Sequence, residues 1–175
     1  MSSQEQFLEE VGTNLKAQTL RLQTAVKALE KVQLNDAPSG GLSVAQIIEH
    51  MRISHLDYAD ALDKILEGPI LADVAPKLSW IGTQFAKVAG PDGNANIPKR
   101  YQPDRKTYGL EVVHQYVELQ NRIVGLSRKF EDVDLNKNYI RNPIFGFIKF
   151  NIADVFHLLV QHNERHIRQV EARIK

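Results

Sequence analysis

The most informative stretch of the sequence is its last part, residues 151–175, because it places metal-ligand side chains on an apolar helical stripe. An α-helix advances about 100° per residue, so one sector of roughly 80° collects several of its side chains. These are Ile152, Val155, Leu159, His162, His166 and Val170. The two imidazoles therefore point toward the core one turn apart, a separation at which two ring nitrogens can bind one metal ion.

The other histidines are distinguished by their positions on the predicted helices. His157 lies about 140° from His162 around the same helix and is predicted to be solvated, as is His114. A second helix carries His50 and His55 near opposite edges of its apolar sector, so the helical angle alone does not choose between them. For His162 and His166, the alternative to metal binding is that both are core histidines satisfied by hydrogen bonds.

The composition excludes several kinds of chemistry. The 175 residues contain no cysteine, which rules out disulfides, thiolate metal ligands and a cysteine nucleophile. Lys and Arg total 22 against 21 Asp and Glu and are interspersed, so nothing predicts nucleic-acid binding. The polar N-terminus and the absence of a long apolar run predict neither a signal peptide nor a membrane segment, and we expect a cytoplasmic location.

Hydrophobic periodicity predicts an all-α protein. Capping patterns and apolar stripes indicate four long helices, near residues 3–32, 43–67, 104–130 and 151–173, and no convincing strand ladder. A short helix around Trp80 to Val88 is expected to lie across them, and residues 99–103 are assigned no regular structure. The length fits one domain over residues 1–175, built as a four-helix bundle whose long insert between the second and third helices implies a crossover.

Several short motifs resemble those of one known family. The segment Gln161-His162-Asn163-Glu164-Arg165-His166-Ile167-Arg168-Gln169 is similar to the H-x-x-R-H-x-x-Q signature that ends the last helix of DinB-like proteins, which include the YfiT-type metal-dependent hydrolases. Asn142 to Gly146 resembles that family's entry to this helix, and Ile47 to Met51 its histidine segment in the second helix. Residues 98–103 also look like the stretch before the third helix of some members.

The resemblance implies a four-helix bundle that holds a divalent metal on three histidines, matched here by His50, His162 and His166. It also favours His50 over His55. Family members with assigned activities are thiol-dependent transferases or isomerases that use low-molecular-weight thiols. One departure is that Val44-Ala45 stand where many members have a tryptophan, which leaves the subfamily and substrate open.

The residue chemistry agrees with an open metal site. Neutral imidazole suits Zn, Ni, Fe or Cu; we expect Zn or Ni first, with Fe or Mn as alternatives. Three protein ligands leave a position for water or substrate, the arrangement of a catalytic site. His55 is read as a boundary histidine, with a fourth ligand or a hydrogen-bond partner of a ligand as alternatives. Tyr58 could donate a proton at the cavity mouth, although a tyrosine on an apolar stripe is more often part of the core. Arg165 could orient an anionic substrate, pair with a carboxylate such as Glu49, or simply lie at the surface.

These observations lead to three functional hypotheses. The first is a metal-dependent transferase or hydrolase that activates a thiol or a water for attack on a small-molecule substrate. The second is a bundle that binds a metal or an apolar ligand without turnover. The third is an interaction module, in which apolar residues before the last helix form a partner surface or a homodimer contact; the alternative is that these residues fold back over the end of the bundle. These residues are Phe145, Phe147, Ile148 and Phe150.

Overall fold

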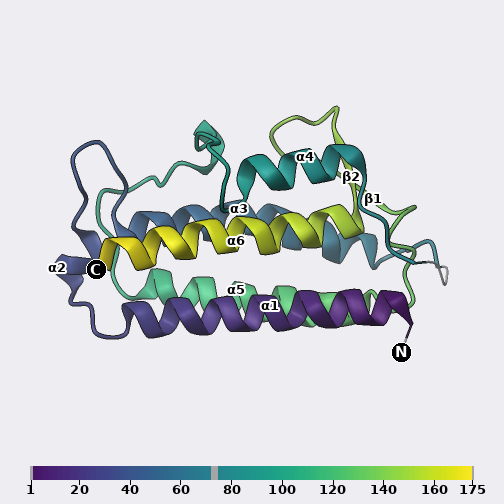
Figure 1. Cartoon of the computed structure of the whole chain (residues 1–175), viewed down its shortest axis with the longest axis horizontal. Coiled ribbons are helices and arrows are strands. Elements are labelled where there is room, and N and C mark those ends of the chain that lie inside the picture. The colour runs from purple at the N-terminus through teal and green to yellow at the C-terminus, as the bar shows by residue number, and fades with distance from the viewer. Residues whose placement is uncertain (1, 72–74, 175) are drawn as a thin grey trace.

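Four long helices dominate the computed structural model, which describes residues 2–71 and 75–174 (Figure 1). They are α1 (Ser3–Val26), α3 (Val44–Ile65), α5 (Glu111–Lys129) and α6 (Ile152–Ile174). The shorter elements are α2 (Lys31–Asn35), α4 (Trp80–Ala89), a 3-10 turn η1 (Lys99–Tyr101) and the strands β1 (Tyr139–Arg141) and β2 (Lys149–Asn151). The predicted all-α four-helix bundle is confirmed.

The helices begin where side chains satisfy their free backbone N–H groups. Three of them start with reciprocal capping pairs, which are Ser2 with Glu5, Ser43 with Gln46, and Asn151 with Asp154. The Asn151 side chain accepts from the backbone N–H of Asp154 at 2.8 Å, and Asp154 accepts from that of Asn151 at 3.2 Å. Because capping fixes the first turn, these pairs set where each apolar stripe begins to face the core.

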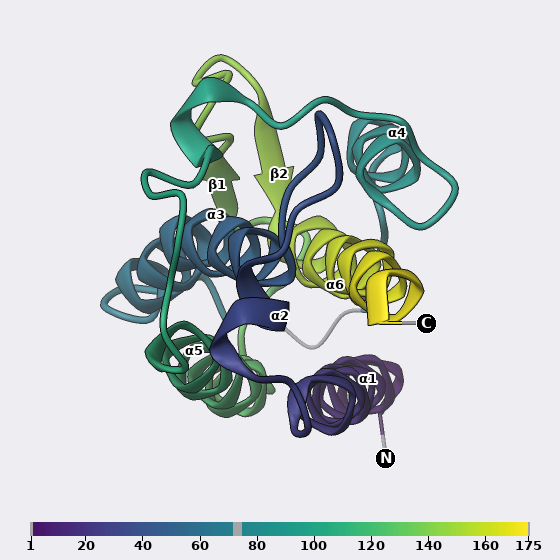
Figure 2. The ribbon, with the colours of Figure 1, turned by 90° about the vertical axis from the view of Figure 1, so that its left-hand side faces the viewer.

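The bundle has a crossed order, visible along its axis in Figure 2. Helix α1 packs beside α5 and α6, and α3 also packs beside α5 and α6, so α1 lies diagonally across from α3. Helices α3 and α5 are neighbours that run in the same direction (Figure 1), so the chain between them must return along the bundle. That return contains α4 and η1 and is the predicted crossover. Helix α4 packs on the outside of α6.

Two helix boundaries were predicted wrongly, because local polar contacts end the regular pattern. Helix α1 ends at Val26 instead of near residue 32, since Glu30 and Gln33 form a capping box that starts α2 in its own direction. Helix α5 begins at Glu111 instead of near residue 104. Before it, the Tyr108 hydroxyl donates to the Asp104 carboxylate at 2.8 Å and holds a turn.

A hairpin was also missed. Strands β1 and β2 pair antiparallel, with Ile140 opposite Phe150 and both buried under the bundle end. Each strand has three residues, too short for the alternation of apolar and polar side chains to stand out in the sequence. The 3-10 turn η1 likewise lies where no regular structure was expected.

The core is divided into two apolar clusters along the bundle. One contains Leu15, Tyr58, Ile123 and Leu159, and the other contains Leu22, Met51, Tyr116 and Ile167, with their neighbours. On each long helix, the residues between these positions include buried polar ones. They are Gln18 and Thr19 on α1, His55 on α3, Gln120 on α5 and Asn163 on α6. A polar layer therefore crosses the bundle, and its groups need partners inside the protein.

The four residues expected to form a partner surface differ in how far they are exposed to solvent. Phe150 is fully buried, and Ile148 packs against the core. Phe145 is half exposed, whereas Phe147 is 82% exposed. Much of the segment thus folds back over the bundle end, and self-association stays a prediction. Within the described ranges, every helix is too short or too polar to serve as a membrane span.

Candidate metal centre

Three histidines from two antiparallel helices converge at one point. Their ligand nitrogens all lie within 4.8 Å of one another, with His50 on α3 and His162 and His166 on α6. The Nε2 of His162 is 3.2 Å from that of His50 and 3.1 Å from that of His166. Two nitrogens that bind one tetrahedral metal at about 2.0–2.1 Å are about 3.3 Å apart, so these residues fit a metal ion.

The outer nitrogens of two of these rings are bound to carbonyl oxygens. His50 Nδ1 donates to the backbone oxygen of Tyr101 in η1 at 2.9 Å. His166 Nδ1 donates to the side-chain oxygen of Gln169 at 2.8 Å. A carbonyl oxygen can only accept, so both rings carry their proton on Nδ1 and turn an unprotonated Nε2 toward the centre. This is the tautomer that a metal requires.

Burial keeps the cluster neutral. Desolvation lowers the pKa of His50, and lowers the pKa of His166 to about 3. The pKa of His162 falls well below its ordinary value, first through burial and then through the neighbouring His166 and His55. Because metal ligation needs neutral imidazole, these shifts favour binding over protonation.

The fourth histidine, His55, lies beside the cluster and is hydrogen-bonded to His162 instead of pointing at the centre. His55 is 1% exposed, and its Nε2 lies 3.0 Å from His162 Nδ1, on the side of that ring opposite the centre. Burial lowers its pKa to about 3. Reading His55 as a boundary residue was wrong, since α3 packs against both α5 and α6 and so buries two of its faces. The structure shows His55 as a hydrogen-bond partner of His162.

The sequence matches the model of one protein family over most of its length. The sequence model of the DinB superfamily matches residues 14–170, which is most of the chain and includes all of these histidines. This chain belongs to the DinB superfamily. No curated protein matches it.

A solved structure supports the fold of this DinB protein. It is YfiT from Bacillus subtilis, described as a probable metal-dependent hydrolase with an unusual four-helix bundle topology. The two share 17% sequence identity and superpose with a TM-score of 0.60, over 95% of this chain and 85% of YfiT. At 17% identity this likeness establishes the fold alone.

A cavity of about 320 Å³ opens onto the DinB histidine cluster. Its walls are mainly apolar and come from α4, the segment after it, the hairpin loop and α6, and they include Phe85, Val88, Ile97, Ile144, Phe145 and Leu158. No acidic residue lines it among the residues that the structure describes. The pocket therefore joins an apolar binding surface to a cluster of neutral metal-type ligands.

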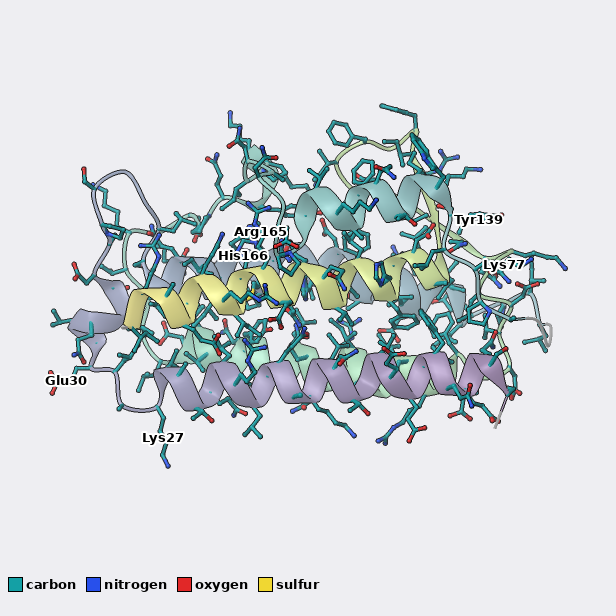
Figure 3. All side chains as sticks on the ribbon, in the orientation of Figure 1. Lys27, Glu30, Lys77, Tyr139, Arg165 and His166 are labelled. Carbon is teal, nitrogen blue, oxygen red and sulfur yellow. The ribbon has the colours of Figure 1, made fainter. Side chains whose placement is uncertain are left out.

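Both polar residues predicted to orient a substrate line this pocket. Tyr58 has a buried ring, and within the described ranges its hydroxyl makes no hydrogen bond to protein. Burial raises its pKa, so the hydroxyl stays protonated and can donate. Arg165, which projects from α6 beside His166 toward the α4 layer in Figure 3, donates to the backbone oxygens of Val88 at 3.0 Å and Ala95 at 3.1 Å.

The suggested pairing of Arg165 with Glu49 was wrong. Glu49 is bound bidentately by Arg52, at 2.7 and 2.8 Å. The Nε of Arg165 is buried without a hydrogen-bond partner in the described part of the chain, and burial lowers the pKa of its guanidinium. Arg165 thus fixes the loop over the pocket and leaves a positive charge at its edge.

The two histidines outside the cluster differ in their exposure. His114 is exposed as predicted, but His157 is only partly exposed, and burial lowers its pKa. The roles of Gln120 and Asn163 in contacting the cluster were missed. A polar residue on an otherwise apolar stripe, as Gln120 is on α5, was the signal that could have indicated it.

Proposed function

We propose that this DinB protein is a metal-dependent enzyme that binds a divalent ion through His50, His162 and His166 and activates a low-molecular-weight thiol or a water for transfer or hydrolysis. The observation that carries the proposal is the convergence of three Nε2 atoms at an apolar pocket. Two of those atoms are already unprotonated through the bonds of their Nδ1 groups. A purely structural cluster would have no need of a cavity above it.

A divalent ion, when bound there, lowers the pKa of a thiol or a water and can polarise a carbonyl. The protein supplies neutral ligands, so the full charge of the ion acts on what enters the pocket. It supplies no cysteine of its own, and thus the sulfur nucleophile must come from a co-substrate. Neutral imidazoles fit Zn or Ni best, with Fe or Mn as alternatives.

The pocket lining favours a thiol over water. A thiol loses its proton near pH 8–9, whereas water requires far stronger activation and commonly a carboxylate base beside it. The described lining holds no carboxylate. The positive edge formed by Arg165 favours an anionic or strongly polarised group, and the aromatic walls formed by Phe85 and Phe145 favour an apolar body. The second substrate is therefore a small electrophile with an apolar part, oriented by Tyr58.

The test is a turnover screen on protein made without an affinity His-tag. The metal-free protein is loaded separately with Zn, Ni, Mn or Fe. Conjugation of an apolar electrophile by bacillithiol, glutathione or cysteine is measured beside hydrolysis of simple esters and amides. We expect metal-dependent turnover with a thiol, lost in His166→Ala because one ligand is removed. His114→Ala, which changes an exposed histidine of α5, is the matched control and should keep full activity.

Two results would contradict the proposal in different ways. If His162→Ala bound zinc as tightly as the parent, the ligand assignment would fail. If the parent bound metal tightly but gave no turnover with any thiol, ester or amide, the protein would be a metal-binding module without catalysis.

A further inference from the structure

A chain of buried polar side chains leads from α5 to the metal centre. The Tyr116 hydroxyl donates to Asn163 Oδ1 at 2.8 Å, and Asn163 Nδ2 donates to Gln120 Oε1 at 2.9 Å. Gln120 Nε2 is 3.0 Å from His55 Nδ1, and His55 Nε2 is 3.0 Å from His162 Nδ1. Each of the four residues before His162 is at most 1% exposed. We call Tyr116, Asn163, Gln120 and His55 the polar relay.

Each bond of the relay determines the direction of the next one. Gln120 turns its amide nitrogen, which can only donate, toward His55, so His55 Nδ1 carries no proton. The single proton of a neutral His55 then lies on Nε2 and is donated to His162 Nδ1. His162 must therefore carry its own proton on Nε2, at the centre of the cluster.

That proton is the one that holds the three rings together without a metal. The Nε2 atoms of His50 and His166 are unprotonated, as shown by the bonds of their Nδ1 groups. His162 Nε2 lies 3.2 and 3.1 Å from them and can donate to either. The relay thus selects the one tautomer of His162 that satisfies the cluster and that cannot bind a metal.

We propose that the polar relay positions the His162 proton, and that its hydrogen bonds reverse direction when a metal binds. This rests on the proposed ligand set. Ligation through Nε2 requires the His162 proton on Nδ1, where it is donated to His55 Nε2. His55 then carries its proton on Nδ1, the amides of Gln120 and Asn163 rotate, and Asn163 donates to the Tyr116 oxygen, whose hydroxyl proton gives up Asn163 Oδ1 as its acceptor. No proton is gained or lost, because both histidines only exchange one tautomer for the other.

The position of the relay supports this role. His55, Gln120 and Asn163 lie in the polar layer between the two apolar clusters, where apolar side chains could have packed in their place, and Tyr116 reaches them from the second cluster. A buried polar network is costly unless every member is satisfied, and in the described orientation this one is satisfied from end to end. Its last member contacts a proposed ligand, and a hydrogen bond to the outer nitrogen of a ligating histidine commonly sets the tautomer and the affinity.

The decisive variant is Gln120→Glu. A carboxylate only accepts, so one oxygen keeps the bond from Asn163 while the other accepts a proton from His55 Nδ1. His55 Nε2 then becomes an acceptor, and His162 carries its proton on Nδ1 before any metal arrives. In long-range ¹⁵N–¹H spectra of the metal-free protein, His162 should change from the Nε2–H to the Nδ1–H form. Zinc affinity should rise about tenfold or more, the size of effect seen for groups that contact metal-bound histidines.

A second variant removes the far end of the relay without adding charge. Tyr116→Phe keeps the ring but deletes the hydroxyl that fixes Asn163, so His162 should populate both tautomers. Tyr108→Phe is the control, because that buried tyrosine bonds to Asp104 and Arg105 outside the relay and should leave the His162 spectrum unchanged.

If His162 keeps the Nε2–H form in both relay variants, the inference is overturned and the network only holds the helices together. A parent protein that binds no zinc would refute the proposed function instead. The spectra of the metal-free protein would still show whether the polar relay sets the tautomer of His162.

Discussion

At the scale of one residue, Tyr58 is the side chain that we propose binds the substrate. Tyr58 lines the pocket, its hydroxyl makes no hydrogen bond in the described part of the protein, and its raised pKa keeps the hydroxyl a donor. A lost hydrogen bond of this kind costs about 1–3 kcal/mol. We therefore expect Tyr58→Phe to lower kcat/KM by roughly tenfold to a hundredfold. Zinc affinity, measured by calorimetry, should not change.

Tyr139→Phe is the control for that variant, because Tyr139 is exposed on β1 and is not among the residues that line the pocket. Equal kcat/KM in the Tyr58→Phe variant and the parent would remove Tyr58 from the binding of substrate.

Some of the site residues could be predicted from the sequence, and others could not. His162 and His166 were identifiable because their spacing places both on one apolar stripe of one helix. His50 and His55 were not separable by angle, since α3 turns two faces inward and both rings are buried. The link from His55 to Gln120 joins residues 65 positions apart on different helices, and no periodicity within one helix can reveal such a contact.

At the scale of elements, the pocket depends on how α4 is attached to α6. The Asp154 carboxylate, 1% exposed, accepts from the backbone and the hydroxyl of Ser79 at 2.7 Å each, and so fixes the N-terminus of α4. Gly82, in the next turn, packs directly against that carboxylate. Helix α4 supplies Phe85 and Val88 to the cavity wall, so its attachment shapes the site.

Gly82→Ala should detach α4. A methyl group at this position would overlap the Asp154 carboxylate, which cannot move without breaking its bonds to Ser79. We expect the free energy of unfolding to fall by about 1–3 kcal/mol, measured by urea denaturation. Amide hydrogen exchange should accelerate in α4 but not in α1.

The matched change is Gly125→Ala in α5, where a methyl group would meet nothing within 4 Å. There alanine should raise the free energy of unfolding by about 0.5–1 kcal/mol through its helix propensity. Similar stabilisation by both substitutions would show that the contact between Gly82 and Asp154 does not limit α4.

Element boundaries were less predictable than the elements themselves. The capping pairs Ser43 with Gln46 and Asn151 with Asp154 were visible as local sequence patterns and lie where expected. The end of α1 was not visible, because Leu29 and Val32 continue its apolar spacing although Val32 is 78% exposed. The structure shows that the chain turns into α2 after α1, so that Val32 points away from the core.

At the scale of the whole molecule, the diagonal arrangement explains how the polar layer is assembled. Because α5 and α6 lie across the bundle from each other, α3 contacts both, and its two histidines face different neighbours. His50 contacts Tyr101 in η1, whereas His55 contacts Gln120 in α5. A bundle with consecutive helices side by side would place different pairs of faces in contact.

Burial of several neutral histidines should make the metal-free protein sensitive to mild acid. In the unfolded chain these side chains take up protons near pH 6.5, whereas in the folded protein the pKa values of His55 and His166 are lowered to about 3 and those of His50 and His162 are also lowered. Between about pH 6.5 and pH 3 the unfolded state binds more protons than the folded state, so the free energy of unfolding must fall as the pH falls. The loss should amount to about 1 kcal/mol per buried histidine between pH 6.5 and 5.5.

Urea denaturation at half-unit steps of pH measures this loss, and its position on the pH axis identifies the cause. Asp57 and Glu164 also have lowered pKa values in the folded protein, but the stability that they contribute is lost only near and below their ordinary pKa of about 4. The decline above pH 5 therefore belongs to histidine. His114→Gln, at an exposed position, should leave the profile unchanged, while His55→Gln should reduce its slope. Constant stability from pH 6.5 to 5 would show that the cluster accepts protons in the folded state, in which case burial does not keep its histidines neutral.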